Sequence, residues 1–366
     1  MSAAATEAGG AVARVTLQTI ADRVGVSRMT VSNAFSRPDQ LSPAMRVRIL
    51  AAAEELGYVG PDPTARALAK GSTGAVGVLL TESLRYAFTD EVAIGFLAAV
   101  ADELAPTGLA LTLLTTSTGP VIPARDVALD GAIVYSCIPE SEALQWLRRR
   151  KLPLVYVDQE PIGEFPSVNI DDRAGARAAA EHLVGFGHRR IGILSSSVTG
   201  PFGLVTDPDQ LRRHEDSNHV SHQRMAGWLE ALDAARIRPS VAVEQSVKAL
   251  DRGEPDDASA GLLLDLPERP TAVLCFSDAI AVRVVAQARA RGLRVPEDLS
   301  VVGFDDAPMA ARMTPALTTV RQDAAAKGRA AATALTGQLA HEPDFPDVLL
   351  PTELVVRAST CPPPTA

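Results

Sequence analysis

Residues 15–57 read VTLQTIADRVGVSRMTVSNAFSRPDQLSPAMRVRILAAAEELG, and this stretch decides how the N-terminal part of the chain folds. Apolar residues recur three and four positions apart after Thr16, which predicts a short helix that ends at Gly25. Ser27 can cap a second helix over about residues 28–35, and a Ser-Pro dipeptide further on starts a third. Three short helices with a tight turn between the first two are typical of a helix-turn-helix unit.

The same spacing predicts the core of this unit, because residues three or four positions apart share one face of a helix. The side chains that we expect to form this core are Leu17, Ile20, Ala21, Val24, Val31, Ala34, Val47, Ile49, Leu50, Ala53 and Leu56. Polar residues between them are expected to face outward. The unit would then have a buried apolar side and a polar side available for binding.

The outward side of the second helix suits contact with DNA. Arg28 can donate two hydrogen bonds to guanine, Asn33 can pair with adenine, and Met29 can touch a thymine methyl group. The short hydroxyl side chains that can bond phosphates are Thr16, Ser27, Thr30 and Ser32. Between residues 14 and 50, six arginines against two aspartates leave a local charge of +4, in a chain whose net charge is −9. This local excess favours phosphate binding, whereas a three-helix bundle used for protein contact is the alternative interpretation.

The stretch TLQTIADRVGVSRMTVSNAF resembles the N-terminus of the lac repressor/gal repressor family of bacterial transcription regulators. The resemblance continues through LSPAMRVRILAAAEELGYV and ARALAKG, and covers nearly everything after residue 14. It implies that ARALA is a hinge helix, which orders on operator DNA in the minor groove. Leu68 matches the leucine that wedges between the central base pairs, and Arg66 of the same segment is a further expected DNA contact. The chain departs from the family at Asn33, where an arginine is common, and before the hinge, which reads GPDPTARALA. The operator sequence therefore does not carry over.

The rest of the chain alternates expected strands with expected helices. Compact apolar runs predict buried parallel strands at residues 75–80, 109–116, 131–136, 153–159, 189–196, 270–278 and 299–306. Amphipathic segments predict helices at residues 90–105, 141–150, 173–187, 220–235 and 279–292. The alternation restarts part-way, which predicts two doubly wound α/β lobes with a cleft between them. The resemblance implies that this body is similar to periplasmic sugar-binding proteins, so the expected fold is an all-α headpiece joined to a two-lobed α/β domain.

These patterns predict the organisation of the chain into domains. The expected parts are a disordered leader at 1–14, the headpiece at 15–60, the hinge at 61–73, a two-lobed effector-binding and dimerisation domain at 74–358, and a tail at 359–366. The first lobe is expected at about 74–170 and 322–345, and the second at about 171–318 and 346–358. The last residues, CPPPTA, are expected to be disordered.

Charged residues follow the expected strands at places where a ligand would bind. Asp158 comes after PLVYV and Asp278 after AVLCFS, and ligands of such sheets bind beyond the carboxyl ends of the strands. These two positions and Arg224 match the family's effector residues, and such groups suit the hydroxyls of a sugar. Helix capping or turn formation explains both aspartates equally well, and Arg224 could simply pair with a carboxylate. Asp323 and residues 84–88 are weaker candidates for lining the site.

Composition restricts the classes of protein to which this chain can belong. Its 366 residues suffice for two or three domains, and 46% of them are hydrophobic, which allows a large buried core. A pI near 5.3 excludes a protein that coats nucleic acid over its whole surface, but fits a basic head on an acidic body. No apolar run reaches membrane-spanning length, and the first residues lack the features of a signal peptide. We therefore expect a cytoplasmic protein without a membrane partner.

The chain carries no signature of catalysis or of a bound cofactor. No glycine-rich strand–helix turn fits a dinucleotide fingerprint, and no Ser/His/Asp or Cys/His pattern is present. The cysteines lie far apart and are expected to be reduced thiols; they are Cys137, Cys275 and Cys361. A polar cluster that fits no metal-ligand template comprises His214, Glu215, Asp216, His219 and His222. We therefore expect no catalytic residue, no cofactor and no metal site.

Together these features predict a transcription regulator, with a repressor as the first choice, which binds a near-palindromic operator as a homodimer. A small molecule, expected to be a sugar or related metabolite, would bind between the lobes and change the affinity for DNA. The alternative from another class is a small-molecule binding protein without a DNA role, and the headpiece argues against it. A glycoside-processing enzyme is a third interpretation, which only the sugar-suited carboxylates support.

Overall fold

The computed structural model describes residues 15–60, 62–80, 84–116, 121–137, 141–160, 162–197, 200–205, 219–245 and 258–365. The chain divides into two compact units, Met1–Thr73 and Gly74–Ala366. The expected leader at 1–14 lies outside the described residues, and so do residues 206–218, which include part of the polar cluster. Among the described residues, no helix combines the length and the apolar character that crossing a membrane requires.

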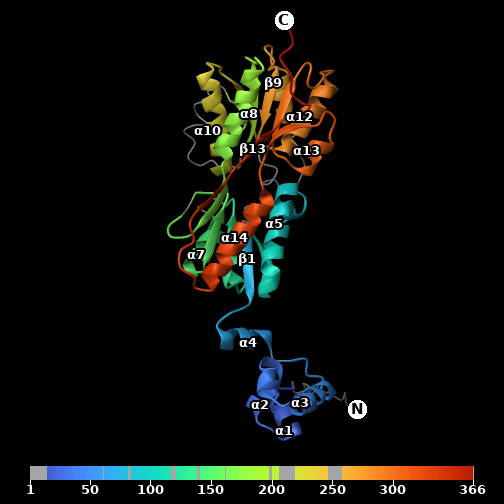
Figure 1. The fold of residues 1–366 in the computed structure, drawn as a ribbon, viewed down its shortest axis with the longest axis vertical. Coiled ribbons are helices and arrows are strands. Elements are labelled where there is room, and N and C mark those ends of the chain that lie inside the picture. Colours follow the sequence, from blue (N-terminus) through green and yellow to red (C-terminus); the bar gives the residue numbers. More distant parts are fainter. Residues whose placement is uncertain are drawn as a thin grey trace, which may run out of the picture. The chain divides into compact units, whose positions relative to one another are not determined.

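The N-terminal unit is helical, as Figure 1 shows in blue. Its elements are α1 (Leu17–Val24), α2 (Arg28–Ser36), the 3-10 helix η1 (Pro38–Gln40), α3 (Pro43–Glu55) and α4 (Pro63–Lys70). Thr16 caps α1, and Ser27 caps α2 by accepting a hydrogen bond from the Thr30 amide at 3.0 Å. Gly25 has a φ of 76°, a left-handed conformation that lets the chain turn sharply between the two helices.

The core of the headpiece lies where helical spacing predicts it, with two exceptions, of which Leu50 is half-buried and does not pack in this core. Ile20, Val31 and Ile49, one from each of the first three helices, are fully buried. Val47 is 67% exposed, so the expectation that it joins this core is wrong. It lies two residues before Ile49, which places it about 200° around the axis of α3, on the opposite side.

The first sheet of the body is parallel throughout. Its strands, in spatial order, are β12 (Val348–Leu350), β5 (Ser167–Ile170), β4 (Leu154–Val157), β3 (Gly131–Tyr135), β1 (Ala75–Leu80) and β2 (Ala110–Thr115). The helices α5 (Glu91–Leu104) and α14 (Ala324–Leu339) pack side by side over one face (Figure 1). The other face carries α6 (Pro123–Asp126) and α7 (Glu142–Arg149). Two 3-10 helices, η2 (Tyr86–Phe88) and η3 (Ala105–Thr107), flank α5.

The second sheet has a parallel centre and antiparallel edges. Its strands, in spatial order, are β13 (Glu353–Val355), β11 (Thr318–Arg321), β10 (Ser300–Asp305), β9 (Ala272–Cys275), β6 (Ile191–Ser197), β8 (Ser240–Gln245) and β7 (Gly203–Val205). The outer strands β13 and β7 run antiparallel to their neighbours. One face carries α8 (Asp172–Gly185) and α10 (His219–Ala234), and the other carries α11 (Ala258–Leu264), α12 (Asp278–Ala290) and α13 (Pro308–Arg312).

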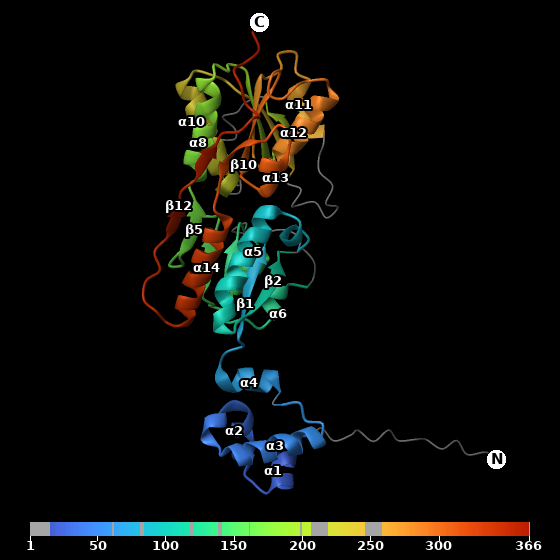
Figure 2. The ribbon, with the colours of Figure 1, turned by 45° about the vertical axis from the view of Figure 1, so that its right-hand side comes forward.

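The chain passes between the two sheets three times, after β5, after β11 and between β12 and β13 (Figure 2). The last passage differs from the division that the sequence suggested. Residues 346–358 were expected in the second lobe, but Val348–Leu350 pairs with β5 in the first sheet. Residues 348–356, VLLPTELVV, form one apolar run in the sequence. In the structure, Val348–Leu350 pairs with the first sheet and Glu353–Val355 pairs with the second. Local hydrophobicity predicts that a segment is buried, but it does not predict which sheet the segment joins. The strands that were not expected are β5, β7, β8, β11, β12 and β13.

The C-terminal segment is held against the second lobe. The Ser359 hydroxyl accepts a hydrogen bond from the Thr318 amide at 2.8 Å, and the Cys361 amide donates to the Ser300 hydroxyl at 3.0 Å. The carbonyl of Cys361 lies 2.9 Å from Nε2 of His188. The expectation that CPPPTA is disordered is therefore wrong at its first residue, because backbone groups of Cys361 bond to the side chains of Ser300 and His188.

Candidate functional site

The second helix of the headpiece presents its polar side to solvent. Met29 is 68% exposed, Arg28 is exposed, and Thr30, Ser32 and Asn33 are half-buried. No ion pair engages Arg28 among the residues that the structure describes, so its guanidinium is available for a partner. The Asn33 side-chain amide donates to Oε1 of Gln40 at 3.2 Å, an exposed bond that a base edge could replace.

Part of the positive charge of the headpiece has a structural use. Arg48 donates to the carbonyl of Val24 at 2.8 Å, at the end of α1, where a cation is favoured by the helix dipole. Arg46 donates to the carbonyl of Ala34 at 3.4 Å. The hydroxyls of Thr16 and Ser27 act as helix caps, although a capping hydroxyl can still donate its own hydrogen to a phosphate.

Helix α4 coincides with the segment predicted as the hinge. Asp62 caps it by accepting from the Thr64 amide at 2.9 Å, and Gly71 ends it with a φ of 71°. The side chains of Leu68 and Arg66 point away from any core, and Leu68 is 86% exposed. Helices of about this length are only marginally stable in water when they are isolated.

Asp158 lies directly after β4 with a φ of 56° and is only 6% exposed. Both of its carboxylate oxygens accept from the Lys327 ammonium group, at 2.9 and 2.6 Å. Lys327 lies in the first turn of α14 and also donates to Oε1 of Gln322 at 2.9 Å. The carboxylate that the sequence suggested as a ligand group is therefore paired with a cation of the protein.

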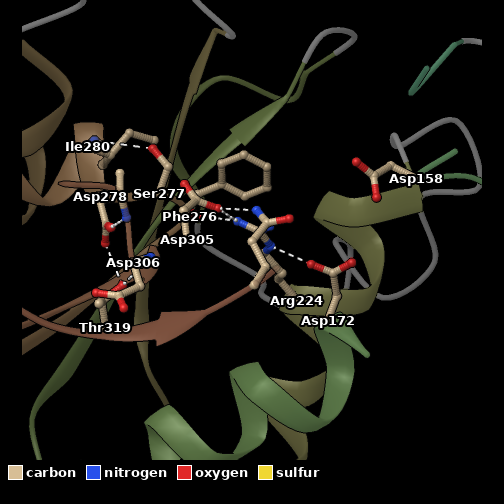
Figure 3. A network of polar contacts seen from close by, with 12 residues as sticks. Asp158, Asp172, Arg224, Phe276, Ser277, Asp278, Ile280, Asp305, Asp306 and Thr319 are labelled. Atoms are coloured by element: carbon tan, nitrogen blue, oxygen red, sulfur yellow. Dashed lines mark hydrogen bonds and ion pairs between the residues drawn. The ribbon is translucent and has the colours of Figure 1, made fainter. Parts of the chain in front are cut away.

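Arg224, on α10, is 3% exposed and is enclosed on all sides. Its Nε donates to Asp172 at 2.7 Å, and its Nη1 donates to the carbonyl of Phe276 at 2.5 Å and lies 3.5 Å from Asp305 (Figure 3). The guanidinium stacks over the ring of Phe304, 3.6 Å from its centroid. Burial raises the pKa of Asp172 to about 6, although the charge of Arg224 acts in the opposite direction. The sequence interpretation that Arg224 pairs with a nearby carboxylate is thus confirmed by its bond to Asp172.

Asp278 is the first residue of α12 and is 1% exposed. Its oxygens accept from the Thr319 hydroxyl at 2.5 Å and from the Ala307 amide at 2.8 Å. The capping residue of α12 is the preceding Ser277. Burial, followed by the nearby charge of Asp305, raises the pKa of Asp278 to about 8. Asp278 therefore anchors the loop after β10 through its bond with the Ala307 amide.

The fourth candidate, Asp323, is exposed and caps α14 by accepting from the Ala326 amide at 2.7 Å. The structure brings Arg224 and Asp278 close to the same residue, Asp305, at the carboxyl end of β10. Asp158 belongs to the first sheet and lies apart from them in Figure 3. Residues 84–88 were weaker candidates for lining the site, and of these Leu84, Arg85 and Phe88 are exposed.

Sequence reasoning missed the partners of these residues, namely Asp172, Lys327 and Gln322. Lys327 left a signal in the sequence, because it shares one helical face with the buried residues Ala331 and Leu335. A lysine on an apolar face implies a buried counter-charge. In the described part of the chain, no group of three or more histidine, cysteine or acidic residues could hold a metal ion. Three members of the polar cluster, residues 214–216, lie outside it.

Comparison with known proteins gives the family. Residues 16–60 match the model of bacterial regulatory proteins of the lacI family, and residues 180–360 match a periplasmic binding protein-like domain. An HTH-type transcriptional regulator from Mycolicibacterium smegmatis is 36% identical over 368 residues, which cover 96% of this chain and 97% of that protein. The chain belongs to the lacI family. It is a DNA-binding transcriptional regulator and not an enzyme.

Solved structures share the fold of this LacI-family regulator. A complex of the transcriptional regulator CelR with cellobiose is 29% identical with a TM-score of 0.66, over 94% of this chain and all of that one. The lac repressor dimer bound to operator and an anti-inducer is 24% identical with a TM-score of 0.73, over 95% of this chain and 99% of that one, a likeness in fold. The predicted family and the predicted fold, a helical headpiece with a two-lobed α/β body, are confirmed.

Proposed function

We propose that this LacI-family regulator is a cytoplasmic, homodimeric repressor, which binds a near-palindromic operator and responds to a sugar or related metabolite. The observation that carries the proposal is α2, a capped helix whose polar face exposes Arg28 and Met29 to solvent. A helix of this kind fits the major groove of duplex DNA. Two-fold symmetry of a dimer would be matched by two-fold symmetry of the operator.

In this proposal the headpiece uses its residues in two ways. Arg28, Met29 and Asn33 contact base edges in the major groove. The side chains that contact phosphates or the minor groove are Thr16, Ser27, Thr30, Ser32 and Arg66. Leu68 inserts between base pairs at the centre of the operator, since its exposed apolar side chain would be removed from water there.

The effector is proposed to bind at the carboxyl ends of the parallel strands of the two sheets. The residues proposed to form this site are Asp158, Arg224, Asp278 and Asp323. Charged groups with fixed orientations suit sugar hydroxyls, and the complex of the related CelR with cellobiose supports a sugar. Asp278 would act by holding the loop after β10, since its carboxylate already accepts from the Ala307 amide of that loop. The effector changes DNA affinity by its different affinity for the two arrangements of the lobes.

The test is selection of binding sites from a random pool of duplex DNA with the full-length protein, at about 0.1 M salt, with no added ligand. Enrichment of one palindrome supports the proposal, and titration of cellobiose and other neutral sugars against that palindrome then identifies the effector. If no sequence is enriched, with or without sugars, the operator role fails. A sugar that stabilises the protein against heat in that case would favour the alternative, a binding protein without a DNA role.

A further inference from the structure

One buried lysine of the first lobe has every hydrogen-bond donor in use. The Lys327 side chain is 1% exposed, and its ammonium group donates to both oxygens of Asp158 and to the side-chain carbonyl of Gln322. An ammonium group has three donors, so none is left over. The ring of Tyr135 lies 5.6 Å from the same nitrogen and gives it a favourable aromatic face.

Stability alone does not explain a lysine at this place. Burying an ion pair costs desolvation energy, and apolar residues of similar size often replace such a pair without loss. Lys327 also lies in the first turn of α14, where the helix dipole disfavours a cation. Desolvation and the helix dipole therefore both disfavour the charge of Lys327. The same face of α14 otherwise carries apolar side chains such as Ala331 and Leu335.

The contacts of Lys327 continue into the second lobe. Gln322 lies in the passage from β11 to α14, and its amide nitrogen donates to Asp305 at 2.7 Å. Asp305 ends β10 in the second sheet and lies 3.5 Å from Arg224, which in turn donates to Asp172. We call this path the inter-lobe network; its members are Asp158, Lys327, Gln322, Asp305, Arg224 and Asp172.

We propose that Lys327 is a positioning residue that couples the two lobes, by tying Asp158 of the first lobe to Gln322 and thereby to Asp305 and Arg224 of the second. The inference rests on the proposed effector site. A hydroxyl that bonds to Asp158 competes with the ammonium group for the charge of the same carboxylate, since each oxygen accepts one bond from Lys327 and can accept a second. The added bond weakens the attraction between Asp158 and Lys327 and lets the ammonium group shift. Any such shift also changes the contact of Lys327 with Gln322. Ligand binding at Asp158 in the first lobe thereby changes the side-chain contacts of Asp305 and Arg224 in the second lobe.

The test needs no effector. Lys327→Met alone would leave Asp158 buried and unpaired, so the informative protein is the double variant Lys327→Met/Asp158→Leu, which removes both charges and keeps the volume. Gln322→Leu breaks the path one step further on and leaves the ion pair intact. Lys151→Met, which changes an exposed lysine of the same lobe, is the matched control. Hydrogen exchange followed by mass spectrometry reports on peptides that cover residues 156–160 and 303–307, and thermal unfolding reports on stability.

Coupling predicts a pattern that a purely structural lysine would not produce. Both the double variant and Gln322→Leu should unfold within about 3 °C of the wild type, yet exchange at least about tenfold faster at 303–307, a segment of the other lobe. Their affinity for the selected operator should change at least about fivefold, whereas Lys151→Met changes neither quantity. Wild-type exchange at 303–307 in both variants overturns the inference. Hydrogen exchange is measured without DNA. If the wild type binds no operator, the proposed function is overturned, and this result is distinct from the exchange result that tests the inference.

Discussion

The hinge leucine allows the proposed DNA contact to be tested quantitatively. Leu68 lies on α4 with 86% of its surface exposed, so insertion between base pairs would remove nearly the whole side chain from water. Leu68→Ala deletes the equivalent of about three methylenes, each contributing about 0.8 kcal/mol when buried, so one hinge loses roughly 2 kcal/mol. A dimer inserts two such residues. The expected loss is roughly 4 kcal/mol, or about a thousandfold in operator affinity.

Fluorescence anisotropy with the selected operator measures this affinity, and energy transfer between dyes at the two duplex ends measures the bend. Binding to an unrelated duplex should change less than about twofold, because the phosphate contacts of the headpiece remain. Val59→Ala, which trims another fully exposed apolar side chain of the same unit, is the control. Operator affinity within about threefold of the wild type, or an unchanged bend in the Leu68→Ala complex, would refute the wedge role.

Three further changes test other parts of the molecule. Arg28→Ala should weaken operator binding by about 1–3 kcal/mol and relax the preference at one base pair; a repeated selection that returns the original operator would contradict this. Because burial raises the pKa of Asp278 to about 8, the folded state keeps a proton that an unfolded aspartate loses near pH 4, so the free energy of unfolding should fall as the pH rises between these values. Denaturant titrations should show a shallower pH dependence for Asp278→Asn, and identical profiles would argue against the raised pKa. Gly227→Ala would push a Cβ into the carbonyl of Arg173 between α10 and α8 and should cost about 1–3 kcal/mol in thermal unfolding, whereas Gly185→Ala, with open space around it, should cost nothing.

Local spacing along the chain determined the parts of this protein that depend on neighbours in sequence. Caps at Thr16 and Ser27, the turn at Gly25 and the three-and-four spacing of apolar residues were sufficient to predict the helix-turn-helix unit. The same reasoning failed at Val47, where an apolar residue was assigned to a face that its position excludes. Compact apolar runs likewise predicted strands β1, β2, β3, β4, β6, β9 and β10. Such features are local, since a cap or a helical face involves residues within four positions of one another.

Only the tertiary structure decided which charged groups are already paired within the protein. Asp158 and Lys327 are 169 positions apart, and Arg224 and Asp172 are 52 apart, so no local pattern joins them. The passage of residues 348–350 back to the first sheet was equally hidden, because an apolar run specifies burial but not the strand beside which it is buried. A buried charge takes its partner from whichever element folding brings against it. That choice follows from the packing of the whole lobe and not from the residues on either side.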